Sequence, residues 1–256
     1  MSTVTRTRQP STARLTLLHA KYALVETLRV PIAVIGSAVF PALAVLFFVV
    51  PQQAAAPSAT QAVISLSVFA VMTNALFSFG LTISENREKP WDPYLRTLPA
   101  PGIARVFAQV LSAGTLGLVA IIPVIAVGGL FTAAEAPPLR VLAGFVALAV
   151  AALPFMLLGT VIGYAMPFKA AMAVVQVVMF GFAFLGGLFL PPMMFAPWLD
   201  AISAFTPSRQ AREFVIWAVQ GGELQWWTWA GILIWTVVLL ALALVLFRRD
   251  QGRRYR

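Results

Sequence analysis

The chain has 256 residues, of which 60% are hydrophobic and 11% charged, against about 45–50% and about 25% in soluble domains. Such a composition cannot cover a water-facing surface, which excludes an ordinary soluble enzyme. The absence of cysteine excludes disulfides, thiolate nucleophiles and Cys-based metal sites. A net charge of +9 would suggest nucleic acid as the partner of a soluble protein, but we expect none here, because membrane chains gather Lys and Arg on one side of the bilayer.

The basic segment 1–29 is predicted to be a tail that precedes the first apolar run. Apolar side chains recur in it at helical spacing: Leu15, Leu18, Tyr22 and Val25. Because Arg14 and Lys21 lie on another face, the pattern favours an amphipathic helix in the membrane interface. A solvated tail that only sets the orientation is the alternative. The apolar run that follows is too long for a secretory signal, so we expect it to stay as an anchor.

The uncharged runs predict an all-α polytopic membrane protein with six transmembrane helices in one domain, residues 30–247. One crossing needs about 20 apolar residues at about 1.5 Å each. The 55-residue uncharged run between Arg29 and Glu85 allows two crossings, because Pro51 to Ser58 provide a break. Four shorter uncharged runs allow one crossing each. The predicted spans are about 30–50, 59–83, 106–130, 141–165, 170–190 and 226–247.

The distribution of Lys and Arg predicts the orientation. With both termini on the same side, fifteen of the eighteen basic residues fall on that side, including the basic tail 248–256. The three others are Arg140, Arg209 and Arg212. Because short cytoplasmic segments carry the excess of Lys and Arg, both termini are predicted to be cytoplasmic.

The predicted outer segment, residues 191–225, differs from the other connections. It holds four prolines and several large apolar side chains with few charges. It is too apolar for a free loop and too broken for a spanning helix. We therefore expect short helices that dip into the outer interface or re-enter the membrane, with their irregular backbone shielded by protein. Trp226, Trp227 and Trp229 are expected to mark the outer end of the last span.

The chemistry of catalysis and of ion-driven transport is missing from the sequence. The only histidine, His19, lies outside all six spans, and no lysine is followed by the Ser or Thr that a P-loop requires. No Asp or Glu falls within the predicted spans, which argues against a proton- or cation-driven transporter. We therefore expect no catalytic or metal site and no enzymatic activity of the chain by itself.

The predicted cytoplasmic loop between spans two and three gathers both signs of charge with aromatic residues. Its candidate contact residues are Glu85, Arg87, Glu88, Trp91, Asp92 and Arg96. Surface ion pairs contribute only ~0–1 kcal/mol each to stability, so folding gives little reason for this cluster. A docking surface for a soluble partner would explain the cluster, because aromatic and Arg anchors carry binding energy and charges set the orientation of the partner. Pro90 and Pro93 are expected to stiffen a short coupling helix near 91–98; a mere topology signal is the alternative.

With this loop, the sequence resembles the membrane subunits of ABC-2-type transporters, including drug-efflux permeases of the daunorubicin-resistance kind. That family carries a segment like R-E-x-G-W-x-x-x-L-R-x-T-P after its second span. Arg87-Glu88-Lys89-Pro90-Trp91, then Leu95-Arg96 and Pro99, match that spacing without a gap. Pro90 replaces the usual glycine, and proline fixes φ and removes the backbone N–H donor at that position. Leu98 stands where threonine is common. The proline-punctuated stretch 187–207 is similar to the family's outer segment after span five.

The resemblance implies the permease subunit of an ABC exporter in the bacterial cytoplasmic membrane, moving a hydrophobic or amphiphilic substrate outward, as in drug efflux, antibiotic resistance or lipid export. It implies a second permease subunit, identical or homologous, and a separate ATP-binding subunit that holds ATP and Mg. This chain would bind no cofactor of its own, and membrane lipid would surround it. The turn at Lys169 would be a second, smaller ATPase contact. A stand-alone secondary transporter or a non-transporting polytopic assembly protein is the alternative.

The resemblance also places the substrate path at the interface of two permeases, lined mainly by spans two and five. The polar residues of these spans are the candidates: Ser67, Thr73, Asn74, Ser78 and Gln176. Hydrogen bonding between helices, worth ~0.6 kcal/mol on average in membranes, is the alternative for each. The Gly159-x-x-x-Gly163 motif of span four is expected to allow close helix packing within the subunit.

Overall fold

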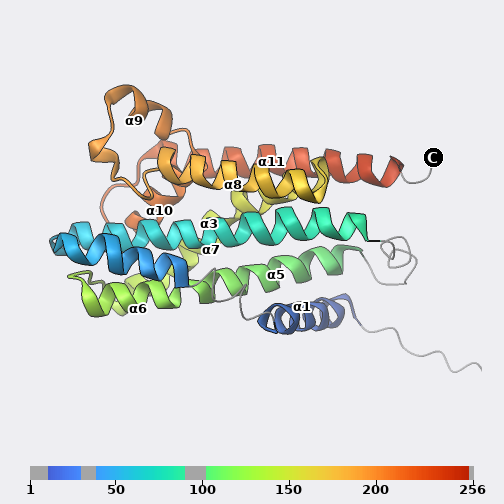
Figure 1. Cartoon of the computed structure of the whole chain (residues 1–256), viewed down its shortest axis with the longest axis horizontal. Coiled ribbons are helices and arrows are strands. Elements are labelled where there is room, and N and C mark those ends of the chain that lie inside the picture. The colour runs from blue at the N-terminus through green and yellow to red at the C-terminus, as the bar shows by residue number, and fades with distance from the viewer. Residues whose placement is uncertain (1–10, 30–38, 90–101, 254–256) are drawn as a thin grey trace, which may run out of the picture.

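The structure, a computed structural model, describes residues 11–29, 39–89 and 102–253. Within these ranges the chain is helical and contains no strand. The long helices run side by side and form an elongated bundle (Figure 1). The helices are α1 (Thr12–Leu28), a short apolar helix (Val39–Gln52), α3 (Ala56–Glu88), α5 (Gly102–Ala120), α6 (Ile122–Phe131), α7 (Pro138–Ala165), α8 (Phe168–Leu185), α9 (Pro197–Ser203), α10 (Pro207–Gln220) and α11 (Trp226–Arg253).

Five helical stretches among the described residues are long and apolar enough to cross a membrane. They are Ala56–Glu88, Phe107–Phe131, Pro138–Ala165, Phe168–Leu185 and Trp226–Asp250. These correspond to predicted spans two to six. For the predicted first span, the described part is the shorter helix Val39–Gln52, and residues 30–38 lie outside the described residues. A total of six spans therefore stays a prediction.

The helix bounds depart from the predicted ones where proline or charge intervenes. The predicted span 106–130 is two helices, α5 and α6, because Pro123 lacks the N–H that would continue the hydrogen-bond ladder. Helix α3 extends past the predicted end at residue 83 through Glu88, since charged side chains are good helix formers. It stops when Lys89 becomes extended, as a residue before proline does.

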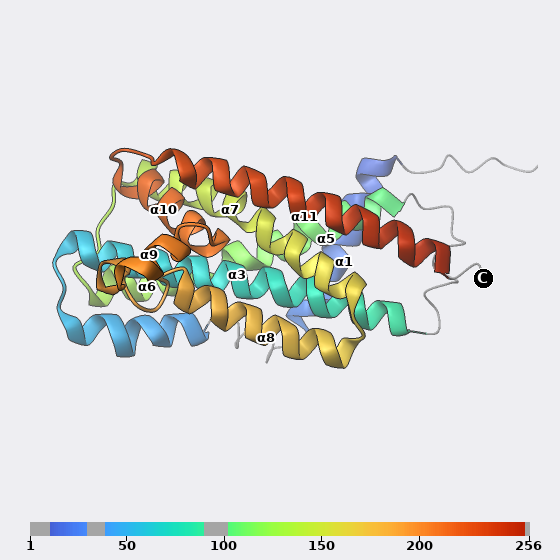
Figure 2. The same cartoon turned by 90° about the horizontal axis from the view of Figure 1, so that it is seen from above.

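The two ends of the bundle carry different elements (Figure 2). At one end lie α1, the end of α3, the start of α5, the turn between α7 and α8, and the end of α11; we call this the α1 end. At the other end, the α10 end, lie the start of α3, the end of α6, and α9 and α10. The described Lys and Arg residues gather at the α1 end, in agreement with the predicted charge segregation. Which end faces the cytoplasm stays a prediction.

Two other predicted segments have helical counterparts. The tail forms α1, which packs along α5 and buries Ala20, although Tyr22 of the predicted apolar stripe is exposed. The segment after α8 forms the short helices α9 and α10, and α10 packs into the bundle against α7, α11 and α3. Neither observation places these helices relative to a bilayer.

Helix α3 lies at the centre of the core. It packs against α5, α6, α7, α8 and α10, and Phe69, Met72 and Leu76 are fully buried. A helix that is apolar on all sides is typical of such a central position. The hydroxyls of Ser65, Ser67 and Ser84 each donate to the carbonyl four residues earlier, at 2.8, 2.8 and 2.9 Å. Buried hydroxyls on α3 are thereby satisfied without a partner helix.

Glycines allow α3 and α7 to approach closely. A Cβ added at Gly159 would lie 3.0 Å from the Cβ of Phe79 and 3.1 Å from the nitrogen of Gly80. One added at Gly163 would lie 2.9 Å from the carbonyl oxygen of Gly80. Because the atoms met are backbone or Cβ atoms, no rotamer change can make room. The prediction that this Gly-x-x-x-Gly motif packs helices within the subunit is confirmed.

We predict that Gly159→Val lowers the free energy of unfolding by about 1–3 kcal/mol, because overpacking forces the α3 and α7 backbones apart. The measurement is thermal and denaturant unfolding of the purified chain in detergent. Gly181→Val on α8 is the matched control, since a Cβ there meets nothing within 4 Å. Equal losses in both variants would contradict the assignment.

Candidate functional site

Arg87, one of the predicted coupling residues, links three helices at the α1 end. Its Nη2 and Nε donate to Oδ1 of Asp250 on α11, at 2.8 and 3.0 Å. Its Nη1 donates to the carbonyl oxygen of Gly163 on α7, at 2.9 Å. The guanidinium carbon also lies 5.8 Å from the ring centroid of Tyr164, within cation–π range. A single side chain at the end of α3 therefore holds α7 and α11.

The partner of Arg87 is a buried acid that the sequence analysis did not single out. The side chain of Asp250 is 6% exposed and that of Arg87 24%. A buried carboxylate is tolerated only when it is paired and hydrogen-bonded, and the guanidinium satisfies both conditions. The available signal was a lone acid among Arg248, Arg249 and Arg253 of the basic tail. We name the group Arg87, Asp250, Gly163 and Tyr164 the α1-end clamp.

Glu88 and Glu85 also make contacts within the chain. Glu88 Oε1 accepts a hydrogen bond of 2.8 Å from the backbone N–H of Phe168, the first residue of α8. The first N–H groups of a helix lack partners inside the helix, and a carboxylate there also suits the helix dipole. Glu85 pairs with Lys89 at 3.1 Å, one turn away on the exposed surface. Lys169, the predicted second contact, is exposed at the start of α8.

The other predicted coupling residues cannot be placed. Trp91, Asp92 and Arg96, with the expected coupling helix near 91–98, lie outside the described residues. The described part of the cluster belongs to the last turn of α3, where Arg87 bonds to α7 and α11 and Glu88 bonds to α8.

Asn74 and Ser78, two of the predicted path residues, contact α5. Asn74 Nδ2 donates to the carbonyl oxygen of Ala113 at 2.8 Å, and Ser78 Oγ lies 3.5 Å from Asn74 Oδ1. Gln109 of α5 donates back to the carbonyl oxygen of Ser78 at 3.2 Å. A Cβ added at Gly117 of α5 would lie 2.9 Å from Asn74 Nδ2, so that glycine makes room for the amide. These contacts favour the alternative of hydrogen bonding between helices.

The remaining three path candidates lie in different surroundings. Ser67 is buried and donates to its own helix. Thr73 is half-buried, and its hydroxyl has no hydrogen-bond partner among the described residues. Gln176 is exposed on α8. Of the five, Asn74 and Ser78 contact each other, and Gln176 alone is exposed.

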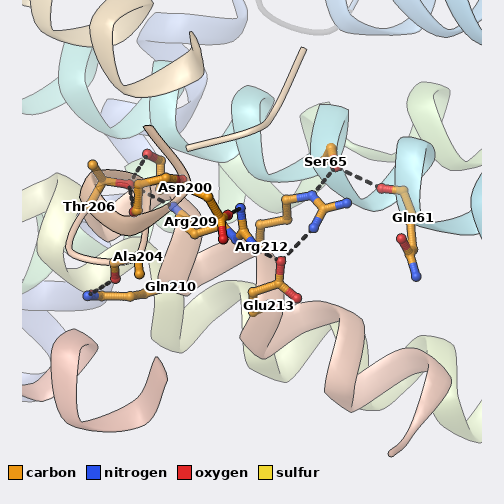
Figure 3. A network of polar contacts seen from close by, with 11 residues as sticks. Gln61, Ser65, Asp200, Ala204, Thr206, Arg209, Gln210, Arg212 and Glu213 are labelled. Atoms are coloured by element: carbon orange, nitrogen blue, oxygen red, sulfur yellow. Dashed lines mark hydrogen bonds and ion pairs between the residues drawn. The ribbon is translucent and has the colours of Figure 1, made fainter. Parts of the chain in front are cut away.

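A second polar network, which the sequence analysis missed, lies at the α10 end (Figure 3). Arg212 of α10 is 5% exposed, and its Nε donates to Ser65 Oγ of α3 at 2.9 Å. Its Nη1 pairs with Glu213 at 2.6 Å. Arg209 pairs with Glu213 at 2.9 Å and with Asp200 of α9 at 3.2 Å. Desolvation by burial lowers the pKa of Arg212 from its usual value, while the charge of Glu213 opposes this shift.

This α10-end network fixes α10 to its neighbours. Arg212 reaches α3, and Arg209 reaches α9. Thr206 caps α10, because its Oγ1 accepts a hydrogen bond of 3.3 Å from the backbone N–H of Arg209. The signal in the sequence was Pro207 at a helix start followed by a cluster of charges between apolar residues. Arg209 and Arg212, two of the three basic residues outside the main basic group, therefore have a structural role.

We predict that Arg87→Met lowers the free energy of unfolding by about 2–3 kcal/mol, because it removes two hydrogen bonds to the buried Asp250 carboxylate. The double variant Arg87→Met, Asp250→Leu should recover most of that loss, since replacing both charges with apolar groups leaves no unpaired charge. Unfolding in detergent measures both. Arg249→Met, at an exposed neighbouring position, should change little. A double variant no better than the single one would contradict the pairing.

Comparison with known proteins agrees with this architecture. Residues 16–220, from α1 through α10, match the family described as ABC-2 type transporter. A protein of Bacillus subtilis (strain 168) with the name "Putative transport permease YvfS" is 24% identical over 189 residues, which is 73% of this chain and 76% of that protein. The chain therefore belongs to the ABC-2 type transporter membrane family.

Proposed function

We propose that the chain is the transmembrane permease subunit of an ABC exporter. It moves a hydrophobic or amphiphilic substrate, such as a drug-like compound or a lipid, outward across the bacterial cytoplasmic membrane. A separate subunit that binds ATP and Mg supplies the energy. The family match over residues 16–220, which covers all of the bundle except its last long helix, is the observation that carries this proposal.

The ATP-binding subunit docks at the α1 end, on the segment between α3 and α5, with Lys169 as a second, smaller contact. Two features support this placement. The described basic residues are concentrated at this end, as the positive-inside rule requires of a cytoplasmic face. The α1-end clamp and the bond from Phe168 to Glu88 connect the start of the docking segment to α7, α8 and α11. A displacement of that segment would therefore act on several spans at once.

Two permease subunits, identical or homologous, form the substrate path between them. Much of helix α8 is exposed in a single subunit. Its exposed side chains include Met172, Val177, Phe180 and Phe184 besides Gln176. Helix α3, in contrast, is largely buried within its own subunit. We therefore assign the lining of the path to α8 in the first place, with Gln176 as its polar group, and Asn74 to packing.

We predict that Gln176→Leu changes export without lowering stability, because the amide has no partner among the described residues and faces outward. Asn74→Leu should lower the free energy of unfolding by about 1 kcal/mol, since it breaks the bond to Ala113. The measurements are efflux of ethidium and of a fluorescent phospholipid from vesicles, and unfolding in detergent. Unchanged efflux by Gln176→Leu would overturn its path assignment.

We predict that Trp91→Ala detaches the ATP-binding subunit or uncouples ATP hydrolysis from export, without lowering membrane insertion. The assay is copurification with the co-expressed ATP-binding subunit and ATP hydrolysis stimulated by the same fluorescent amphiphiles. Glu88→Arg should have the same effect and should also lower stability, because α8 loses its carboxylate acceptor.

The control for Trp91→Ala is Trp198→Ala, an exposed aromatic of α9 at the opposite end of the bundle. If Trp91→Ala keeps both the ATP-binding subunit and full export, the segment only sets topology. Export that continues without any ATP-binding subunit would favour a stand-alone secondary transporter instead.

A further inference from the structure

A cavity of about 300 Å³ lies inside one subunit near the α10 end. Helices α3 and α7 each line it with one face, through positions spaced by three and four residues from Thr60 to Ser67 and from Val141 to Leu148. Helix α6, the residues just before α7, and α10 complete the wall. No residue of α8 or α11 lines it, so this cavity is separate from the path proposed above.

The wall of the cavity is chemically almost uniform. Apart from Thr60, Ser67 and Glu135, every lining residue is aliphatic, aromatic or glycine. The polar groups of the first two are already used: Thr60 Oγ1 donates to Ala56 O at 2.8 Å and accepts from Glu135 N at 3.2 Å, and Ser67 donates to Val63 O at 2.8 Å. Water needs about two to four polar partners to occupy a cavity, so this one suits hydrocarbon.

The cavity is also open to the surroundings of the bundle. Gly129 and Glu135 are exposed members of the wall, whereas Val215 and Leu148 at its base are buried. The lining residues of α3 and of α7 each extend over seven positions, so the cavity is about 10 Å long. Most of its lining residues belong to the candidate membrane spans that contain α3, α6 and α7, so lipid chains would surround these walls. Glu135, an exposed residue of the wall, can meet a polar headgroup.

We infer that this cavity binds one hydrocarbon chain of a bilayer phospholipid. The chain fills the space between α3, α6, α7 and α10 and makes the dispersion contacts that an empty space would forfeit. The inference rests on the fold and the candidate spans, and it holds whether or not the proposed exporter function is correct.

Gly129 provides the test, because a Cβ built there meets no atom within 4 Å although the residue lines the cavity. Gly129→Leu therefore adds a side chain at the wall of the cavity without a backbone clash. Gly181→Leu on α8 is the matched control: its Cβ also meets nothing within 4 Å, and it does not line the cavity. Ala134→Phe is a second filling variant, in a connecting segment, in case the first one fails to fold.

The full chain is expressed without an ATP-binding subunit, purified in detergent and examined by native mass spectrometry. We expect the unsubstituted chain and Gly181→Leu to retain a phospholipid, and both filling variants to lose most of it. Adding dioleoyl phosphatidylglycerol should raise the unfolding midpoint of the first two by a few degrees and leave the filling variants unchanged.

Two results would overturn the inference. One is the same phospholipid retention and the same rise in midpoint for the filling variants and the control. The other is a retained mass that belongs to an amphiphile other than a bilayer lipid, which would identify the cavity as a site for transported substrate.

Discussion

The close approach of α3 and α7 is the constraint on which the rest of the structure depends. Gly159 and Gly163 of α7 lack the side chains that would separate its backbone from that of α3. Without water-driven association in the bilayer, helices join through such van der Waals contact and through hydrogen bonds. Once α3 is held against α7, its other faces become surfaces for α5, α8 and α10. The same approach brings the carbonyl oxygen of Gly163 within 2.9 Å of Arg87 Nη1.

Each end of this helix pair then carries charges that need partners. At the α1 end Arg87 pairs with Asp250. At the α10 end Arg212 donates a hydrogen bond to Ser65 and pairs with Glu213. Charges removed from water are costly unless they are paired, so each arginine specifies which helix lies beside it. The apolar contacts between the two ends, by contrast, would tolerate many arrangements of similar volume. The polar ends thus provide specificity, whereas the buried core between them is apolar.

The sequence predicted local features of the helices, but it did not predict which distant residues pair with each other. Runs free of charge predicted five stretches that the structure describes as candidate spans, and the break after Pro51 holds a left-handed residue, Gln53, with φ of 45°. The partners of Arg87 and Arg212 lie 163 and 147 residues away, and which helices become neighbours is not encoded in local periodicity. A polar residue such as Asn74 gives the same pattern whether it lines a path or joins two helices, so only its observed bond to Ala113 separates the two.

Helix α3 connects the two polar ends directly. Ser65 and Arg87 are separated by 22 residues, about 33 Å along the helix axis, and no proline interrupts it between them. Helix α7 carries Pro154 inside it and is the weaker candidate for a stiff rod. Under the proposed function, a push on the segment after α3 would move this rod as a unit, since packed helices shift as rigid bodies and not as elastic ones. The bond from Arg212 to Ser65 would then carry the displacement to α10. In this way, ATP hydrolysis by a partner subunit at the α1 end would change the structure at the α10 end.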